Sequence, residues 1–352
     1  MNTVRDRSNN FDAIRLLGAV MVLVGHTYPI AGRPYSPPLW GGSIQTAGLV
    51  LFFSLSGYLI YRSWSFDSRL LPYLAKRSLR IFPALVVVVL VSMFVLGPLL
   101  TRLSITEYAS NIHLWEYLKN IVLSPVYALP GVFETNPIPN AVNGSLWSLP
   151  AEFACYLMVP VVALLPKVSR GPTFFVLALG SGILSEWMSA GSIRIVIWGT
   201  DLAQATSVWP YFLMGAAIAS AGAWLSLRVD VGFIALLGAT ILAGVIPQFA
   251  SIPYWIGLPY AIIAFGSSST PVVKRAGRFG DFSYGIYLWA FPIQQTVVFL
   301  WPNQTVPLIV AITTVAAVGL AFLSWHLIEK PALSFKRFVE PRVVLPRGSS
   351  AT

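Results

Sequence analysis

Arg15 and His26 are the most informative pair of ionisable residues in the first apolar stretch, because their side chains can bind charge or move a proton. At 100° per residue, the eleven positions between them make three turns plus about 20°. Both side chains therefore project from one face of a helix, roughly 16 Å apart along its axis. Within a membrane each such group costs about 2.5–3.5 kcal/mol on insertion scales, so we treat both as functional candidates.

Glu152 and the arginine pair Arg77 and Arg80 complete the set. Glu152 comes six residues after the start of the fourth apolar stretch, which runs in the opposite sense. We therefore expect Glu152 at a depth similar to that of His26, where a carboxylate would stabilise the imidazolium and make the histidine a general base. Arg77 and Arg80 are three apart, share a helix face and present two guanidinium groups suited to a phosphorylated ligand.

Structural interpretations stay open for all of these residues. Arg77 and Arg80 could be ordinary anchors at a membrane surface, His26 could serve only a hydrogen bond, and Glu152 could neutralise an arginine across the bundle. The three histidines of the chain are scattered without metal-ligand spacing, and no glycine-rich phosphate loop is present. The sequence therefore predicts no metal cofactor and no ATP-driven pump.

The elements that must position these residues are transmembrane helices. Of the 352 residues, 56% are hydrophobic and only 10% are charged, against roughly 25% charged in soluble domains. A spanning helix needs about 20 mostly apolar residues. Ten segments meet this requirement: 12–31, 42–61, 81–100, 146–166, 172–190, 206–224, 231–247, 254–272, 282–301 and 306–328. We expect an all-α, polytopic membrane helix bundle of about ten transmembrane helices.

Charge and small residues refine this expectation. Asp12 and Arg15 inside the first segment favour a retained helix over a cleaved signal peptide. The single cysteine, Cys155, excludes an internal disulfide framework. The polar stretch 101–145 is expected to form short helices that cap an external cavity. The spacing of Gly215, Ala219 and Ala223 would let two helices approach closely.

Basic residues set the orientation. Most of the 23 Lys and Arg residues fall in the connections on the side of the two termini, and the other side has only Arg33, Arg102, Lys119 and Arg194. The positive-inside rule therefore predicts that both termini are cytoplasmic and that the chain is a multi-pass protein of the cell (inner) membrane. The net charge of +10 then reflects orientation and attraction to membrane lipids, and we expect no nucleic-acid partner.

Six stretches, in chain order, resemble motifs of the membrane-bound acyltransferase 3 family, whose members O-acylate carbohydrates and related cell-surface or secreted molecules. They are FDAIR (11–15) followed by His26, FFSLSGY (52–58), RSLRIFP (77–83), NGSLWSLPAE (143–152), FSYGIYL (282–288) and EKP (329–331). The chain departs from the family pattern after Leu288, where many members carry a histidine and this sequence has Ala290, Phe291 and Pro292. A second essential histidine at that place is therefore not expected.

The resemblance implies a transmembrane acyltransferase domain over residues 1–335 and a basic cytoplasmic tail over 336–352, which we expect to be disordered. It further implies a membrane-embedded O-acyltransferase that moves an acetyl group from cytoplasmic acetyl-CoA to a sugar hydroxyl of a cell-surface polysaccharide or secreted glycoside. The expected partners are the acyl-CoA, the carbohydrate acceptor, membrane lipids and other proteins of glycan assembly.

In this interpretation Arg77, Arg80 and Arg15 hold the phosphates of the donor. His26 acts as general base or as a transient acyl carrier, and Glu152 orients it or balances its charge. The candidate substrate-binding residues of the cavity are Ser54, Ser56, Ser145 and Trp147.

Two other classes of protein fit the sequence less well. A secondary transporter or flippase for a lipid-linked sugar also has many helices with a few buried charges. The titratable groups, however, concentrate in the first, third and fourth segments, and the sequence has no inverted repeat. A non-catalytic scaffold would leave His26 and Glu152 unexplained.

Overall fold

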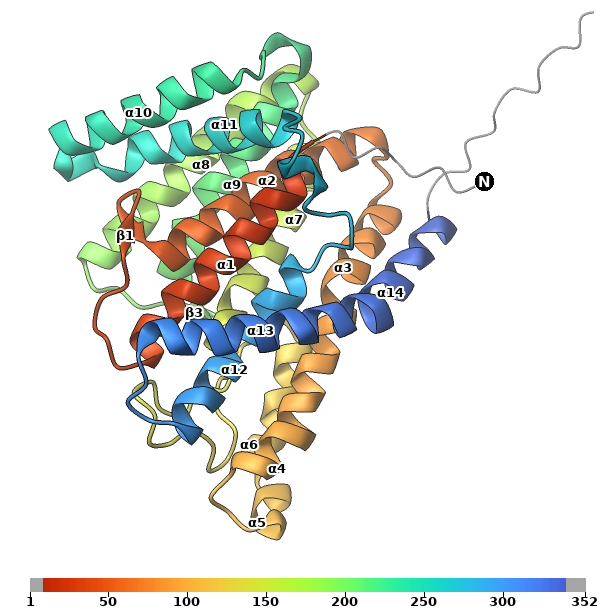
Figure 1. Cartoon of the computed structure of the whole chain (residues 1–352). Helices are drawn as coiled ribbons and strands as arrows, with labels where there is room; N and C mark the ends of the chain where they lie inside the picture. The colour runs from red at the N-terminus through yellow and green to blue at the C-terminus, as the bar shows by residue number, and fades with distance from the viewer. Residues whose placement is uncertain (1–8, 340–352) are drawn as a thin grey trace, which may run out of the picture.

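The computed structural model describes residues 9–339. It is a bundle of helices (Figure 1), and the strands within the described part are limited to two short antiparallel hairpins. Six helical segments are long and apolar enough to cross a membrane: Phe11–Ile30, Ile44–Phe66, Leu70–Leu100, Gly144–Val162, Lys167–Ala190 and Val306–Phe338. The prediction of an all-α membrane bundle is therefore confirmed, and the chain is a multi-pass membrane protein.

The long helices follow the predicted segments in order. They are α1 (Phe11–Ile30), α2 (Ile44–Phe66), α3 (Leu70–Val91), α7 (Ser148–Val162), α8 (Lys167–Ala190), α9 (Leu202–Ala221), α10 (Val229–Val245), α11 (Ser251–Ser267), α12 (Ser283–Leu300) and α13 (Val306–Ser324). Four of them, α9 to α12, are not among the six candidate spans. A count of ten spans and the cytoplasmic placement of the termini therefore stay predictions.

Short elements connect the long helices at the two ends of the bundle. They are β1 (Pro38–Leu39), β2 (Gly42–Ser43), α4 (Gly97–Leu100), α5 (Ile105–Ser110), α6 (Ile112–Glu116), η2 (Tyr117–Val122), η3 (Gly144–Trp147), β3 (Val196–Ile197), β4 (Thr200–Asp201), η4 (Gly222–Trp224), η5 (Pro247–Phe249), η6 (Val273–Arg275), α14 (Lys330–Ser334) and η8 (Phe335–Phe338). The short helices expected within 101–145 are thus present. We call the end with the start of α1, the α2–α3 connection and α14 the basic face, and the other end the distal face.

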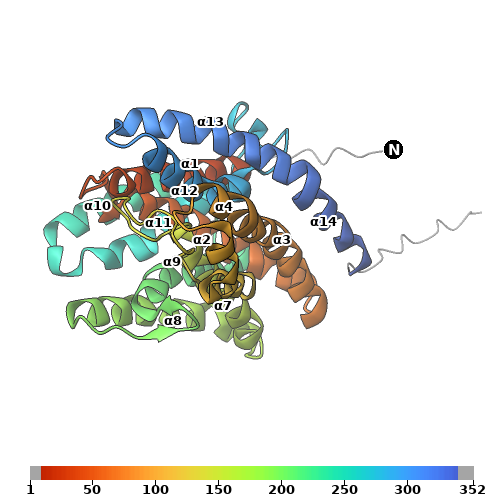
Figure 2. The same ribbon diagram turned by 90° about the horizontal axis from the view of Figure 1, so that it is seen from below.

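Helix α2 is the centre of the packing. In Figure 2 it lies between α13 on one side and α8 on the other, and it contacts α1, α7, α9 and α11. Glycines allow these contacts: Gly48 lies against the backbone of Gly18 on α1, and Gly57 and Gly215 bring the backbones of α2 and α9 together. The close approach expected from Gly215 is therefore found. A side chain at any of these positions would push two helices apart.

The start of α3 differs from the prediction. The helix begins at Leu70, not at residue 81, and continues through a π-helical turn at Ser92–Leu96 to Leu100. Arg77 consequently lies two turns inside the helix and not at its entrance. The α2–α3 connection is held by Asp67, which accepts hydrogen bonds from Arg69 (2.9 and 3.1 Å) and Lys76 (3.3 Å). The hydrogen bonds from Arg69 hold the pKa of Asp67 well below its ordinary value, so this connection carries a paired charge at neutral pH.

Candidate active site

A cavity of about 300 Å³ opens among α1, α2, α3, α7 and α12 at the basic face. Its α2 lining runs from Leu49 to Ile60, which is eleven positions, or about 16 Å of helix. The polar lining residues are Asp12, Arg15, Ser56, Arg77, Arg80, Ser148, Glu152, Tyr156, Asp281, Ser283, Tyr284, Tyr287 and Lys336. The volume is at the lower end of the range for small-molecule sites, about 300–1,000 Å³, so the cavity can hold part of a larger ligand.

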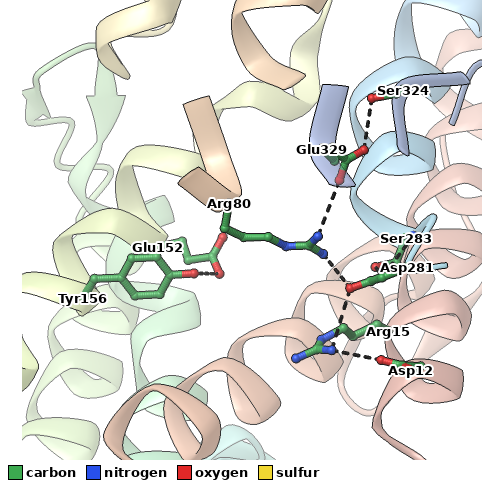
Figure 3. Close-up of polar contacts among 9 residues, drawn as sticks. All are labelled: Asp12, Arg15, Arg80, Glu152, Tyr156, Asp281, Ser283, Ser324 and Glu329. Carbon is green, nitrogen blue, oxygen red and sulfur yellow. Dashed lines mark hydrogen bonds and ion pairs between the residues drawn. The ribbon is translucent and has the colours of Figure 1, made fainter. Parts of the chain in front are cut away.

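Arg15 and Arg80 are joined by one carboxylate (Figure 3). Asp281 lies 2.6 Å from a guanidinium nitrogen of Arg80 and 3.7 Å from one of Arg15. Arg80 also contacts Glu329 at 3.4 Å, and Arg15 contacts Asp12 at 3.2 Å. These ion pairs satisfy both cations within the protein and tie α1, α3 and the start of α12 to the chain after α13.

Asp281 remains ionised in this arrangement. Burial alone would raise the pKa of Asp281, but the guanidinium groups of Arg80 and Arg15 outweigh it and lower the pKa to about 2. Ser283 adds a hydrogen bond of 2.5 Å from its hydroxyl to the same carboxylate. Asp281 is therefore a fixed negative charge that holds two arginines in place.

Arg77 is the exception among the three arginines. One terminal nitrogen donates to the hydroxyl of Ser63 at 3.3 Å, and the guanidinium lies 5.9 Å from the ring centre of Tyr73. Within residues 9–339 no carboxylate lies within ion-pair distance of Arg77, and its Nε is buried without a hydrogen-bond partner. Buried donors are almost always paired, and a buried charge without a counter-ion is costly. Arg77 is thus the one of these three arginines that the described residues leave without a counter-ion.

Glu152 lies in the same cavity, surrounded by hydroxyl groups. Its Oε1 accepts hydrogen bonds from Ser56 at 3.0 Å and from Tyr156 at 2.5 Å. Deeper towards the distal face, the hydroxyls of Ser148 and Tyr287 share a hydrogen bond of 2.6 Å, and Tyr287 donates to the carbonyl of Ser145. The cavity therefore has the guanidinium of Arg77 and, surrounded by the hydroxyls of Ser56 and Tyr156, the carboxylate of Glu152.

His26 does not line this cavity. Its ring is half-buried and packs edge-on against Phe291, with ring centres 5.4 Å apart. None of the described residues hydrogen-bonds to its ring nitrogens. Phe52 and Tyr287 line the cavity with their ring centres 6.1 Å apart, and Phe291, which His26 contacts, follows Tyr287 by four positions on α12. We call Phe52, Tyr287 and Phe291 the aromatic layer.

The expected pairing of Glu152 with His26 is not found. The carboxylate is turned towards Ser56 and Tyr156, in the compartment of the arginines, and no hydrogen bond or ion pair joins it to the histidine. The depth estimate counted residues from the start of each segment. It did not include the 3₁₀ turn Gly144–Trp147 before α7 or the rotation of α7 about its axis, which together direct Glu152 to the basic side of the aromatic layer.

Of the four predicted substrate-binding residues, the cavity contains Ser56. Ser54 is buried on another side of α2, and its hydroxyl has no partner within the described chain, because two positions along a helix turn a side chain by about 200°. Ser145 donates to Asn143 at 2.7 Å and belongs to the packing of η3. Trp147 packs against the hydrophobic core.

Sequence reasoning missed Asp281, Tyr156 and Glu329. Tyr156 follows Glu152 by four positions, so helical spacing alone could have paired them. Asp281 directly precedes the motif at 282–288, and Glu329 begins the motif at 329–331. The signal in both cases was an acidic residue at the end of an apolar segment, for which the sequence offered no partner.

Comparison with known sequences identifies the protein class. The profile of the acyltransferase 3 family, described as an acyltransferase domain, matches residues 8–326. The chain belongs to the acyltransferase 3 family. This acyltransferase is 33% identical over 343 residues to an O-acetyl transferase of Shigella phage Sf6, covering 93% of this chain and 97% of the phage protein. No solved structure matches it.

Two further relatives match this acyltransferase at 26% identity. Nodulation protein 10 of Rhizobium leguminosarum bv. viciae aligns over 93% of this chain and 94% of its own length. Peptidoglycan O-acetyltransferase OatA of Listeria monocytogenes aligns over 81% of this chain and 49% of its own length.

Proposed function

We propose that this acyltransferase moves an acetyl group from cytoplasmic acetyl-CoA to a hydroxyl of a sugar in a cell-surface polysaccharide or secreted glycoside. Two of the relatives are named as O-acetyltransferases, one of them acting on peptidoglycan. The observation that carries the proposal is Arg77, a half-buried arginine whose Nε is buried without a partner and which has no counter-ion among the described residues, in a cavity that also contains Glu152 and its hydroxyl partners. The enzyme would lie in the cell (inner) membrane with the basic face in the cytoplasm.

The donor would bind from the basic face. The nucleotide is too large for a cavity of about 300 Å³, so it would stay at the mouth, with its phosphates on Arg77 and near Lys336. The narrow arm that ends in the thioester would enter along α2. Arg15 and Arg80 would shape this path, because their charges are already taken up by Asp281, Asp12 and Glu329.

The acceptor would meet His26 on the distal side of the aromatic layer. The ring of His26 has no hydrogen-bond partner among residues 9–339 and is partly exposed. A neutral imidazole in this state can accept the proton of a sugar hydroxyl that attacks an acyl carbon. His26 would thus be the general base for the acceptor.

The test uses purified protein in lipid vesicles with radiolabelled acetyl-CoA and a glycan acceptor from the same cells. His26→Ala and Arg77→Ala should each reduce label transfer at least about a hundredfold. Arg228→Gln is the matched control, because this arginine pairs with Asp230 at the surface and should retain transfer. Full transfer by well-folded His26→Ala would reject its catalytic role, and flipping of a lipid-linked sugar without consumption of acetyl-CoA would favour a transporter.

A further inference from the structure

A second hollow lies at the basic face, on the segment that joins α11 to α12. Its volume is about 400 Å³, and its lining consists of Val272, Arg275, Ala276, Arg278 and Phe279. None of these residues lines the cavity of the candidate active site. Two guanidinium groups and several apolar side chains thus share a surface that the proposed function does not use.

The two arginines of this hollow have no internal counter-ion. No carboxylate of the described chain lies within ion-pair distance of Arg275 or Arg278, and the next acidic residue, Asp281, is already held in the ion pairs of the active-site cavity. The guanidinium of Arg278 lies over the ring of Phe279, 4.4 Å from its centre. A guanidinium stacked on a ring keeps the N–H groups at its edge for hydrogen bonds. The hollow therefore offers positive charge and several donors to an anion.

The apolar side chains of the hollow indicate which kind of anion fits. Val272 is 81% exposed and Phe279 is 62% exposed. At the surface of a membrane, apolar side chains beside basic ones reach the boundary between headgroups and acyl chains. A soluble phosphate would bind the arginines but would leave both apolar side chains in water. An anionic phospholipid would cover them as well, because its acyl chains begin next to its phosphate.

The segment lies where the lipid-facing surface of α13 ends. Gly280 packs on the indole of Trp325, the residue that follows α13. Two positions further on, the ring of Phe282 contacts Phe322, which is exposed on α13 together with Leu323. Exposed apolar surface of this kind marks contact with a membrane. A lipid with its headgroup in the hollow would therefore have an apolar helix surface next to it for its chains.

The hollow is also held in a fixed position. Asn10, a fully buried residue before α1, donates to the hydroxyls of Ser268 and Thr270, both at 3.1 Å, and accepts from the backbone N–H of Thr270 at 3.2 Å. The turn η6 contacts α1 as well. Because the segment is fastened at Asn10 and again at Trp325, little of its backbone has to be ordered when a ligand binds, and the entropic cost of binding is low.

We propose that this hollow binds the headgroup of an anionic phospholipid from the membrane leaflet at the basic face. Arg275 and Arg278 hold the phosphate, and Val272 and Phe279 contact the start of the acyl chains. The site does not depend on the proposed function, since neither acetyl-CoA nor a sugar takes part in it. A bound lipid would brace the segment that leads directly to Asp281 and thus to the ion pairs of the active-site cavity.

The experiment measures lipid binding to the purified protein by native mass spectrometry. Protein in neutral detergent is titrated with phosphatidylglycerol or, in parallel, with phosphatidylcholine that has the same acyl chains. Wild type should bind phosphatidylglycerol more tightly than phosphatidylcholine. Arg275→Gln combined with Arg278→Gln should weaken the binding of phosphatidylglycerol roughly thirtyfold, about fivefold for each arginine, and should leave that of phosphatidylcholine unchanged. Phe279→Ala should also weaken the binding of phosphatidylglycerol.

A matched control removes the same charge elsewhere. Lys167 is exposed at the start of α8, and Arg228 pairs with Asp230 at the surface. Lys167→Gln combined with Arg228→Gln should bind both lipids as wild type does. Thermal unfolding in detergent without lipid should give the same melting temperature for wild type and for every variant, so that a loss of binding reports the site and not the fold.

Three outcomes would overturn the proposal. The first is equal binding of phosphatidylglycerol by wild type and by the double arginine variant. The second is an equal loss in the control variant, which would show only diffuse attraction between charges. The third uses coenzyme A and inorganic phosphate as competitors: if either displaces phosphatidylglycerol from wild type while Phe279→Ala binds this lipid normally, the hollow is a site for soluble phosphates and not for lipid.

Discussion

Replacing Asp281 by asparagine should destabilise the fold by an amount that can be worked out from the ion pairs around it. The pKa of Asp281 is lowered from 3.8 to about 2, because Arg80 and Arg15 outweigh the effect of burial. Such a difference corresponds to about 2.5 kcal/mol of stabilisation at neutral pH. Arg80 keeps Glu329 and Arg15 keeps Asp12 in the variant, so neither cation is left without a counter-ion. We therefore expect a loss of about 2–3 kcal/mol.

The pH dependence of the folding stability tests the direction of this effect. A carboxylate whose pKa is lower in the folded state stabilises the protein above its unfolded pKa, and this contribution is lost as the pH falls through the folded pKa. The window for Asp281 thus runs from about pH 4 to about pH 2. At pH 3, about 1 kcal/mol of the contribution should be gone.

The assay is thermal unfolding of purified protein in detergent, followed by the loss of the monodisperse peak in size-exclusion chromatography. At pH 7, Asp281→Asn should unfold roughly 3–6 °C below wild type, and the gap should narrow at pH 3. Asp230→Asn, which removes an exposed carboxylate on α10, is the control and should change little. A gap that is absent at pH 7, or that widens in acid, would refute the reasoning.

Three other substitutions test separate parts of the structure. Arg77→Lys keeps the charge but not the planar guanidinium, so the KM for acetyl-CoA should rise about tenfold with kcat nearly unchanged in steady-state kinetics. Tyr156→Phe removes a hydrogen bond to Glu152 worth about 1–2 kcal/mol, so kcat should fall roughly tenfold and the melting temperature by a few degrees; a loss of stability with unchanged kcat would contradict this. Gly48→Ala places a methyl group 2.6 Å from the backbone of α1 and should lower the stability measured by thermal unfolding by about 1–3 kcal/mol. Gly238→Ala, with open space around it, is the control and should be neutral. Equal effects of the two substitutions would show that helix propensity, and not close packing, determines the change in stability.

Much of the fold could be predicted because apolar length is a direct consequence of the membrane environment. The segments at 12–31 and 306–328 agree with α1 and α13 to within a few residues. The start of α3 could not be found in the same way, since Lys76, Arg77 and Arg80 lower the hydropathy of a stretch that is nonetheless helical. Lys76 and Arg80 have carboxylate partners in Asp67 and Asp281, and hydropathy does not record such partners.

The sequence predicted which residues belong to the site better than it predicted the contacts between them. Helical spacing placed Arg15 and His26 on one face of α1, but it could not show that the lining of the cavity would include Arg15 and leave out His26. Likewise, the position of Glu152 in the sequence fixed neither the rotation of α7 nor its choice of Ser56 over His26. Contacts between helices depend on axial rotation and on the small residues that let backbones approach, and a single sequence leaves both open.

The lining of the cavity ends towards the distal face at Leu49 and Phe52 on α2, Ser148 on α7 and Tyr287 on α12. A bundle with so many charges along its axis would conduct protons if that path continued to the distal face, and the ion gradients of the cell would collapse. Because the charged lining residues lie nearer the basic face than this end of the lining, the enzyme can present its charged groups to one compartment.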